Sequence, residues 1–507
     1  MVTNQILPKT PLSFKVLSTS LRPDYRIRVR FLRKWIIIFL LSMTFLLTFP
    51  LSVGCDDQVP STGTTYYVSP EGKNSNPGTL NAPWASPGYG SRKLKPGDTL
   101  VILSGRYILS RYNEDILIPT SGTTDAWITI RGKEGNRPAL VGRDDLAMAI
   151  DLSGTSYVRI ENLEITHDDQ ANGMARNFRD GIVVVEKPAS HILFKNLYIH
   201  HLDEFGLNIQ DIDNLRIIDC RIEYAGFGAV GGPQGEKGGW RNVLIQGCRL
   251  SYSGHYYQGG DGTNRPYDRP DGFGIESSSG PIDILQTVAE HNRGDGLDSK
   301  AENTTIQQTI VANNSCDGIK LWGDRSRIEN TLIYGRGDGN PEGTPWSAIV
   351  IDTEKRNAHF EIINVTVDDT AGGNYLMYVQ YDHQNLPISL HIQNSIFRGI
   401  GPESPIFIGK ATKITLKNNL FYIPHTNSVL IHGDQEYTAN TINRLGHGNI
   451  YSDPLFIQPA WGTNGNYHLK KGSPAINAGV SKGSPSIDLE GRSRDNAPDI
   501  GAYEDAS

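Results

Sequence analysis

The sequence predicts an all-β protein whose body is a right-handed parallel β-helix, a solenoid with coils of about 22 to 34 residues. Two observations support this fold class. Short β-prone runs follow one another along most of the chain, with few helix signals between them. A four-residue pattern that begins as Asn-Leu recurs at irregular steps, and the shortest step, 22 residues, occurs twice in succession. Units of this length bury their apolar face only by stacking on their neighbours.

The Asn-Leu pattern marks one column of the solenoid. It appears at residues 162–165 and recurs at 196–199, 219–222 and 247–250. We expect the later rungs at Val288, Ile310, Leu332, Val365, Ile396 and Leu420. Inward side chains of one column stack about 4.8 Å apart. Cys220 and Cys248 share a position in this ladder, which predicts two stacked buried thiols, with a disulfide as the alternative.

A second column begins each time with Gly and continues as a short alternating run. Its members are the pairs 181–182, 206–207, 228–229, 272–273, 296–297 and 318–319. The periodicity alone also fits other solenoids. However, the segments 65–72 and 95–100 resemble the opening of many exported parallel β-helix proteins, and 472–479 and 499–504 resemble their C-terminal segment. The resemblance implies a right-handed parallel β-helix and export.

The N-terminus carries a targeting signal. Basic residues between 26 and 34 precede an apolar run at 35–53, which ends in small residues directly before Cys55. This order resembles a bacterial lipobox and implies a lipid on Cys55; a signal anchor in the membrane and simple secretion are the alternatives. We therefore expect an exported, cell-surface or extracellular protein, held at the membrane as a lipoprotein. The expected organisation is a signal at 1–55, a linker at 56–64, the β-helix at 65–450 and a capping segment at 451–507.

The composition limits the partners. The 507 residues carry a net charge of −7, which gives no general attraction for nucleic acid, so we expect no nucleic-acid partner. An acidic substrate would need a local basic patch or a bound cation. Four cysteines are too few for a disulfide-built scaffold of this size. We expect a monomer.

Three successive coils of the Gly column place charged side chains on one outer face. The coils are 271–276, 295–300 and 317–322. Alternation along each strand leaves outside the residues Asp271, Gly274, Glu276, Asp295, Asp298, Lys300, Asp317, Lys320 and Trp322. Five clustered carboxylates favour a cation, and oxygen-only ligands suit Ca²⁺. The alternative is a surface charge ladder, with Asp298 paired to Lys320 and Glu276 paired to Lys300.

Loop insertions flank this charged face. The segments 251–270 and 335–346 enter between an Asn-Leu rung and the next Gly column, so both leave from one edge. The loop 167–179 leaves from that edge as well. Long loops in a compact repeat are often functional. We expect substrate contacts from Arg265, Tyr267, Arg269, Trp322, Arg325 and Trp346.

The same three coils resemble family 9 polysaccharide lyases, pectate lyases with this fold. Asp271 before Gly-Phe, Asp295 and Asp298 around Gly-Leu, and Lys320 within Gly-Ile-Lys-Leu match the family's motifs. The resemblance implies that the three aspartates bind Ca²⁺ and that Lys320 is the catalytic base. The activity would be β-elimination on an acidic, pectate-like polysaccharide. Gly294 stands where the family has an acidic ligand.

Two other functions remain open from the residues. A glycoside hydrolase could use two of the same carboxylates as acid and base, and a non-catalytic glycan-binding or adhesive surface protein needs only the fold, the anchor and aromatic loops. The sequence contains no Asp-Pro-His motif typical of uronate epimerases. Because Lys320 is expected to point outward, we expect its removal to spare the fold. We also expect that removing Asp298 frees Lys320.

Overall fold

The computed structural model describes residues 63–232, 239–259, 270–335, 347–370, 375–402, 404–459 and 465–505. Several predictions lie outside these residues: the signal and Cys55, and the expected substrate contacts Arg265, Tyr267, Arg269 and Trp346. Within the described ranges, no helix has the length and apolar character needed to cross a membrane.

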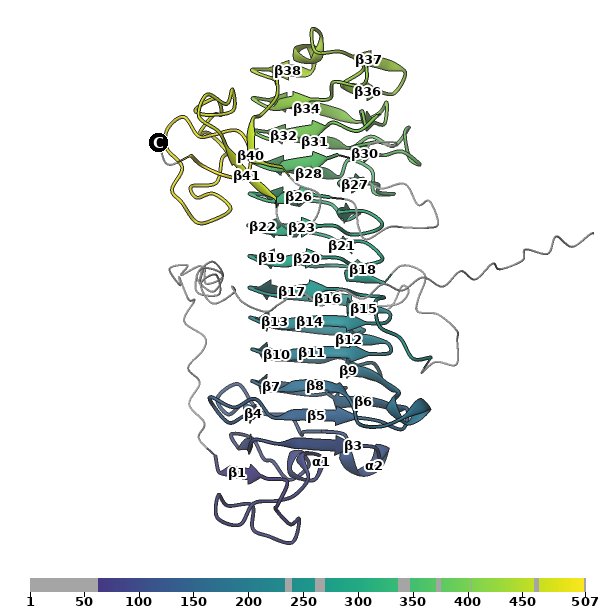
Figure 1. Cartoon of the computed structure of the whole chain (residues 1–507), viewed down its shortest axis with the longest axis vertical. Coiled ribbons are helices and arrows are strands. Elements are labelled where there is room, and N and C mark those ends of the chain that lie inside the picture. Colours follow the sequence, from purple (N-terminus) through teal and green to yellow (C-terminus); the bar gives the residue numbers. More distant parts are fainter. Residues whose placement is uncertain are drawn as a thin grey trace, which may run out of the picture. The chain divides into compact units, whose positions relative to one another are not determined.

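The predicted fold class is confirmed. The chain visits three long sheets in turn and pairs each strand in parallel with its counterpart one coil away, so that the coils form a stack (Figure 1). The first sheet contains β1 (Thr65–Val68), β2 (Thr99–Ile102), β4 (Ile128–Gly132), β7 (Ser156–Glu161), β10 (Ala189–Lys195), β13 (Asp211–Ile218), β16 (Gly239–Gln246), β19 (Ile282–Leu285), β22 (Thr304–Gln307), β25 (Ser326–Glu329), β28 (His359–Ile363), β31 (Ser389–Gln393), β34 (Lys413–Lys417) and β38 (Gly446–His447).

The second sheet holds the Asn-Leu column at its start. It contains β3 (Arg106–Leu109), β5 (Ala139–Gly142), β8 (Glu164–His167), β11 (Tyr198–Leu202), β14 (Arg221–Ala225), β17 (Arg249–Ser251), β20 (Val288–Glu290), β23 (Ile310–Ala312), β26 (Leu332–Tyr334), β29 (Thr366–Asp369), β32 (Ile396–Gly399), β35 (Leu420–Tyr422) and β39 (Ile450–Tyr451).

The third sheet holds the Gly column. It contains β6 (Leu146–Asp151), β9 (Phe178–Val184), β12 (Phe205–Ile209), β15 (Gly228–Gly231), β18 (Asp271–Ser278), β21 (Leu297–Ala301), β24 (Ile319–Leu321), β27 (Ile349–Ile351), β30 (Met377–Val379), β33 (Ile406–Ile408), β36 (Leu430–His432) and β37 (Gln435–Tyr437), of which β37 pairs antiparallel with β36. The remaining elements are α1 (Pro87–Ser91), α2 (Tyr112–Asp115), η1 (Gly173–Arg176), η2 (Ile442–Leu445) and the antiparallel pair β40 (Phe456–Gln458) and β41 (Asn466–Leu469).

The ladder of the second sheet follows the predicted register only in part. Leu197, Cys220 and Cys248 stand one residue before β11, β14 and β17, which pair in register, and all three are buried. The rungs expected from Val288 onward are wrong by one residue, and Val365 is the exception. Val288 pairs with Arg249, which is the residue after Cys248. The position in register with Cys248 is Thr287. In the third sheet, Val230 rather than Ala229 aligns with Phe273.

Polar residues continue the inward column after the cysteines. Thr287, Thr309 and Thr331 each donate a hydroxyl hydrogen bond to the backbone carbonyl two residues earlier, at 2.9, 2.9 and 2.7 Å. These short bonds satisfy a buried hydroxyl at the turn, so a Thr can replace an apolar residue there. Cys220 and Cys248 are free thiols, so the expected stacked pair is confirmed and the alternative disulfide is not formed. Burial raises the pKa of the Cys248 thiol.

The C-terminal segment lies against the side of the coils, shown in yellow in Figure 1. Turn residues after the first sheet donate side-chain hydrogen bonds to its backbone: Gln308 to Asp488, Asn330 to Ile487 and Asn418 to Ala478. Apolar side chains of the segment also form a second core on the outer face of the second sheet. Its members include Leu332, Ile396, Leu420, Phe456, Tyr467, Leu489 and Ile500.

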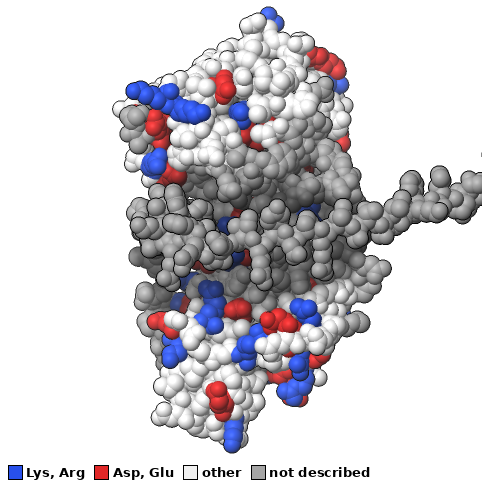
Figure 2. Space-filling model, viewed as in Figure 1, with Lys and Arg blue, Asp and Glu red and all other residues white. Residues whose placement is uncertain are grey.

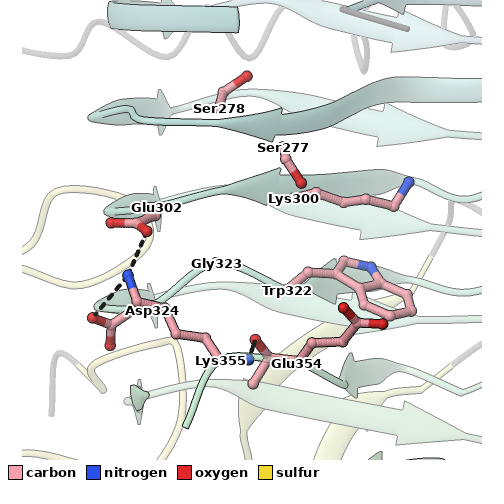
Figure 3. A pocket seen from close by; sticks show the side chains of 10 residues that line it. Ser277, Ser278, Lys300, Glu302, Trp322, Gly323, Asp324, Glu354 and Lys355 are labelled. Atoms are coloured by element: carbon pink, nitrogen blue, oxygen red, sulfur yellow. Dashed lines mark hydrogen bonds and ion pairs between the residues drawn. The ribbon is translucent and has the colours of Figure 1, made fainter. Parts of the chain in front are cut away.

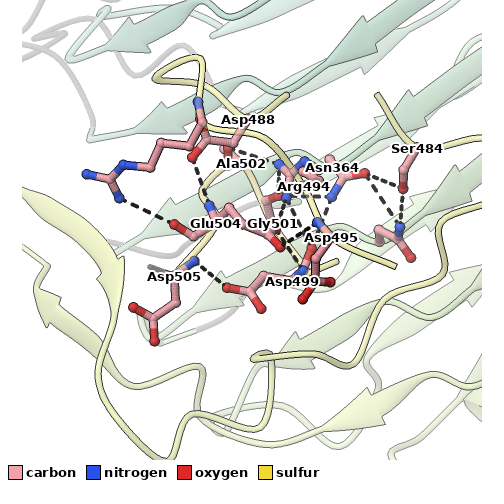
Figure 4. A network of polar contacts seen from close by, with 12 residues as sticks. Asn364, Ser484, Asp488, Arg494, Asp495, Asp499, Gly501, Ala502, Glu504 and Asp505 are labelled. Carbon is pink, nitrogen blue, oxygen red and sulfur yellow. Dashed lines mark hydrogen bonds and ion pairs between the residues drawn. The ribbon is translucent and has the colours of Figure 1, made fainter. Parts of the chain in front are cut away.

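A buried arginine organises this segment (Figure 4). Arg494 donates to the Glu504 carboxylate at 2.8 Å, to the Asn330 side-chain oxygen at 2.9 Å and to the Gly501 carbonyl at 3.0 Å. Asp488 accepts the backbone N–H of Glu504 at 2.9 Å. The arginine thus ties the last residues of the chain to the turn at Asn330.

Candidate functional site

The charged face predicted from the Gly column lies on the outer side of the third sheet. Phe273, Leu297 and Ile319 pair in register and point into the core, where each is fully buried. The next residue of each strand therefore points outward. Asp298 pairs with Gly274 on one side and with Lys320 on the other, so these three form one outer column.

A second outer column is built from carboxylates that each bind the next coil. Asp271 Oδ1 accepts the backbone N–H of Asp295 at 2.7 Å, and Asp295 Oδ1 accepts that of Asp317 at 2.7 Å. Asp317 Oδ1 accepts the backbone N–H of Ser347 at 2.8 Å. One oxygen of each carboxylate is thereby committed to the backbone, and the other remains available for chemistry.

Lys320 takes two of the remaining oxygens. Its Nζ lies 2.8 Å from Asp295 Oδ2 and 3.0 Å from Asp317 Oδ2. The ion pairs of Lys320 are thus with Asp295 and Asp317, and not with the expected partner Asp298. Removing Asp298 would therefore leave both salt bridges of Lys320 in place. The side chain points outward as predicted but is only 11% exposed. In place of the expectation that its removal spares the fold, this environment predicts that removal destabilises it, because two buried carboxylates would lose their counter-charge.

The local charges shift the acidities of this group. Burial and the neighbouring Asp295 raise the pKa of Asp271, and the same two causes raise that of Asp298 to about 6. Burial also raises the pKa of Asp317 to about 6, although Lys320 opposes the shift. For Lys320, burial favours the neutral amine, but Asp295 and Asp317 outweigh it and raise the pKa. The lysine is therefore held as an ammonium ion.

Three carboxylates are arranged so that they could hold a cation. Oxygens of Asp271, Asp295 and Asp298 lie within 4.8 Å of one another. The Oδ1 atom of Asp298 is buried and has no hydrogen-bond partner. Gly274 leaves room beside this group, because a Cβ there would lie 2.7 Å from Asp271 Oδ2. Convergent carboxylate oxygens, one of them unsatisfied, fit a hard divalent cation such as Ca²⁺.

The residues considered as replacements for the acid missing at Gly294 have other partners. Glu276 accepts from Lys300 Nζ at 2.6 Å, which is the salt bridge expected for a charge ladder. Lys300 Nζ also lies 3.6 Å from Asp298 Oδ2. Asp317 is engaged by Lys320. Asp295 is engaged by Lys320 as well, so Asp271, Asp295 and Asp298 are chosen because their oxygens converge.

A hollow of about 400 Å³ adjoins this group at the carboxyl ends of β18, β21 and β24. Figure 3 shows Lys300, Trp322 and Glu354 on one side of it. The expected substrate contact Trp322 thus lines a hollow next to the carboxylates. Arg325 lies instead in ion pairs with Asp324 at 2.7 Å and with Glu302 at 3.0 Å.

Three further residues, Thr353, Glu354 and Lys355, line the same hollow and carry no signal in the motifs of the sequence. They follow β27 in a turn that leads back to the first sheet, at the opposite end of the strand from the predicted loops. The 33-residue step between Leu332 and Val365 contains both this turn and the loop 335–346, so the length of the step alone does not reveal the turn. Comparing the lengths of both turns in each coil could have found them.

The described start of the loop 251–270 folds along the edge of the third sheet. The Tyr256 ring stacks on His167 with 5.1 Å between ring centroids, and the backbone N–H of Gln258 donates to Asp203 at 2.8 Å. The described residues 251–259 therefore run back over the preceding coils, on the side from which the loop 167–179 also leaves. In the face of Figure 2, basic and acidic side chains of the described residues are intermingled.

The fold and this face together define a right-handed parallel β-helix with a cluster of aspartate carboxylates on its third sheet. The chain belongs to the Pel9A-like family: a model described as a Pel9A-like right-handed β-helix region matches residues 66–341. The chain is similar to a solved pectate lyase Pel9A, with 16% identity and a TM-score of 0.51 over 88% of this chain and 97% of that one. It is also similar to XylC in complex with xylose, with 10% identity and a TM-score of 0.54 over 87% and 98%.

A curated relative belongs to another class of enzyme. The chain is 30% identical to a lacto-N-biosidase from Bifidobacterium longum subsp. longum over an alignment of 199 residues. The alignment covers 28% of this chain and only 12% of the relative's own length.

Proposed function

We propose that the protein is an exported, membrane-anchored polysaccharide lyase that cleaves a uronate-containing polysaccharide by calcium-assisted β-elimination. The observation that carries the proposal is the placement of Lys320 beside three convergent carboxylates on one outer face. Membership of the Pel9A-like family supports it.

Asp271, Asp295 and Asp298 would hold the Ca²⁺ ion. When bound, the ion supplies positive charge that pairs with the uronate carboxylate and stabilises the negative charge that develops at C5. Lys320 removes the proton from C5. The electron pair of that C–H bond forms the C4–C5 double bond, the C4–O bond breaks, and the leaving oxygen takes a proton from solvent.

The ammonium state of Lys320 has to change before this step. The amine must be neutral to accept a proton, whereas Asp295 and Asp317 keep it charged in the structure. A cation held by Asp271, Asp295 and Asp298 would compensate the charge of Asp295 and weaken its attraction for the ammonium. Asp317 then remains as the main partner, at 3.0 Å.

The test measures the unsaturated product by its ultraviolet absorbance on polygalacturonate, alginate and glycosaminoglycans, with Ca²⁺ or with EDTA. We expect Ca²⁺-dependent product from the wild type and none from Lys320→Met. Lys300→Met is the comparison variant, because Lys300 stands in the neighbouring outer column, and it should lower the activity much less than Lys320→Met does. An active Lys320→Met variant rejects the assigned base. A wild type inert on every polyuronate rejects the lyase and favours a glycan-binding surface protein.

A glycoside hydrolase that uses the same carboxylates is the second candidate. The similarity to a lacto-N-biosidase favours it, and so does Asp298, whose pKa of about 6 leaves it partly protonated and able to act as a general acid. New reducing ends without an unsaturated product would identify a hydrolase. Equal amounts of both would identify the lyase.

A further inference from the structure

The hollow beside the carboxylates has the features of a sugar-binding position. It is bounded by the Trp322 ring, and Gly323 forms part of its lining. Gly323 must lack a side chain, because a Cβ there would lie 1.9 Å from the Ala301 carbonyl oxygen. The rest of the lining is polar, with hydroxyl and charged side chains that can form hydrogen bonds with sugar hydroxyls.

The cations at this hollow are already compensated. Lys300 is paired with Glu276 at 2.6 Å. Figure 3 shows Lys355 on the far side from Trp322, in ion pairs with Glu302 and with Asp324, the latter at 3.7 Å. Among the residues that line the hollow, two lysines face three acids. The lining therefore offers no spare positive charge for the carboxylate of a sugar.

One side chain connects the hollow to the three aspartates Asp271, Asp295 and Asp298. Lys300 lines the hollow and also lies 3.6 Å from Asp298. Trp322 directly follows β24 and stands two residues beyond Lys320, which corresponds to about 6.6 Å along an extended chain. A sugar in the hollow would thus be the neighbour of a sugar at the carboxylates.

We infer that this hollow binds a neutral sugar next to the reacting uronate, so that the substrate is a polysaccharide in which uronates and neutral sugars are neighbours. The inference rests on the proposed function for the position of the uronate. The Trp322 ring packs against the apolar face of the neutral sugar, and the surrounding polar groups bind its hydroxyls. A uronate in the same place would add a carboxylate to a lining that already holds Glu302, Asp324 and Glu354 and whose two lysines are paired.

Isothermal titration of the full chain in EDTA, which prevents turnover, tests the inference. The probes are oligosaccharides of alternating galacturonate and rhamnose, and oligogalacturonates of the same length. We expect the alternating probe to bind about tenfold more tightly, which corresponds to about 1.4 kcal/mol. Trp322→Ala should remove this preference. Trp127→Ala is the control, because Trp127 packs on Tyr157 and Arg159 beside the first sheet.

Glu354→Lys is the second variant, and it should shift the preference toward oligogalacturonate by adding the missing positive charge. Equal or tighter binding of oligogalacturonate by the wild type overturns the inference, and so does a preference that survives Trp322→Ala. The proposed function fails separately: if neither probe yields an unsaturated product with Ca²⁺ but the preference is present, the neutral-sugar position stands and the lyase does not.

Discussion

Replacing Lys320 with methionine should destabilise the protein strongly, although the side chain belongs to the outer face. Its Nζ lies 2.8 and 3.0 Å from two carboxylates that are 3% and 5% exposed. Each pair contributes about 5 to 6 kcal/mol of attraction at an effective dielectric constant near 20, before desolvation is subtracted. Breaking a buried pair from one side costs about 3–5 kcal/mol, because the remaining charges stay buried. We expect a loss in this range at pH 7.

The pH dependence of this loss has a definite sign. A carboxyl whose folded pKa lies above its unfolded value destabilises the fold progressively as the pH rises between the two values. Asp317 already has a pKa of about 6 with Lys320 present, and the variant removes the cation that opposes a further rise. The difference between Lys320→Met and the wild type should therefore grow from pH 5 to pH 7.

Urea unfolding in EDTA, followed by tryptophan fluorescence at both pH values, measures this difference. Lys300→Met serves as the control, since Lys300 is 27% exposed and its partner Glu276 is 46% exposed. We expect the control to lose no more than about 1 kcal/mol. If Lys320→Met unfolds at the same urea concentration as the wild type at pH 7, Lys320 is not held between the two carboxylates and the reasoning fails.

Two further predictions concern the cation and a second charged pair. Ca²⁺ should raise the melting temperature of the wild type, with a gain of about 2.7 kcal/mol at a hundred times the dissociation constant; Asp298→Asn should abolish most of that gain, and an unchanged gain would exclude Asp298 as a ligand. His383 Nδ1 lies 2.7 Å from Asp352, and this hydrogen bond raises the pKa of the imidazole above 6.5. The pair contributes its full stabilisation to the fold below pH 6.5 and loses it as the pH rises through the raised pKa of His383. His383→Gln should therefore lower the free energy of unfolding by about 0.5–1 kcal/mol at pH 5.5 and by less at pH 9. Equal losses at both pH values in chemical unfolding would contradict this.

The repeat could be predicted from the sequence because stacking imposes one apolar position per coil. This rule located the ladder up to Cys248. It failed at Val288, Ile310 and Leu332, where outward side chains are apolar and the inward position is held by threonines. For Ile310 and Leu332 the reason is the C-terminal segment, which forms a second core with them on the outer face. Apolarity marks the inside only where nothing else covers the outside.

The candidate site followed the same logic. Alternation after each Gly placed Asp298 and Lys320 in one outer column, as observed. It could not assign the salt bridges, because a lysine side chain is long enough to reach carboxylates in the neighbouring column. It also could not show the hollow at Trp322, since that depends on a turn after β27 whose path no local pattern specifies.

A carboxylate of the second outer column, the column of Asp271, Asp295 and Asp317, is not by itself a sign of function. Asp180 occupies this column three coils before Asp271, where its Oδ1 accepts the backbone N–H of Phe205 at 2.8 Å. Burial raises its pKa to about 6, as at Asp317, yet its other oxygen accepts from the Asn208 amide at 3.0 Å. The hydrogen bond to the next coil thus explains an aspartate here without any ligand. What distinguishes the candidate site is the second oxygen, which faces charge. Asp180→Asn should therefore weaken the fold and leave the Ca²⁺ response unchanged, and a lost response would show that the column acts through stability alone.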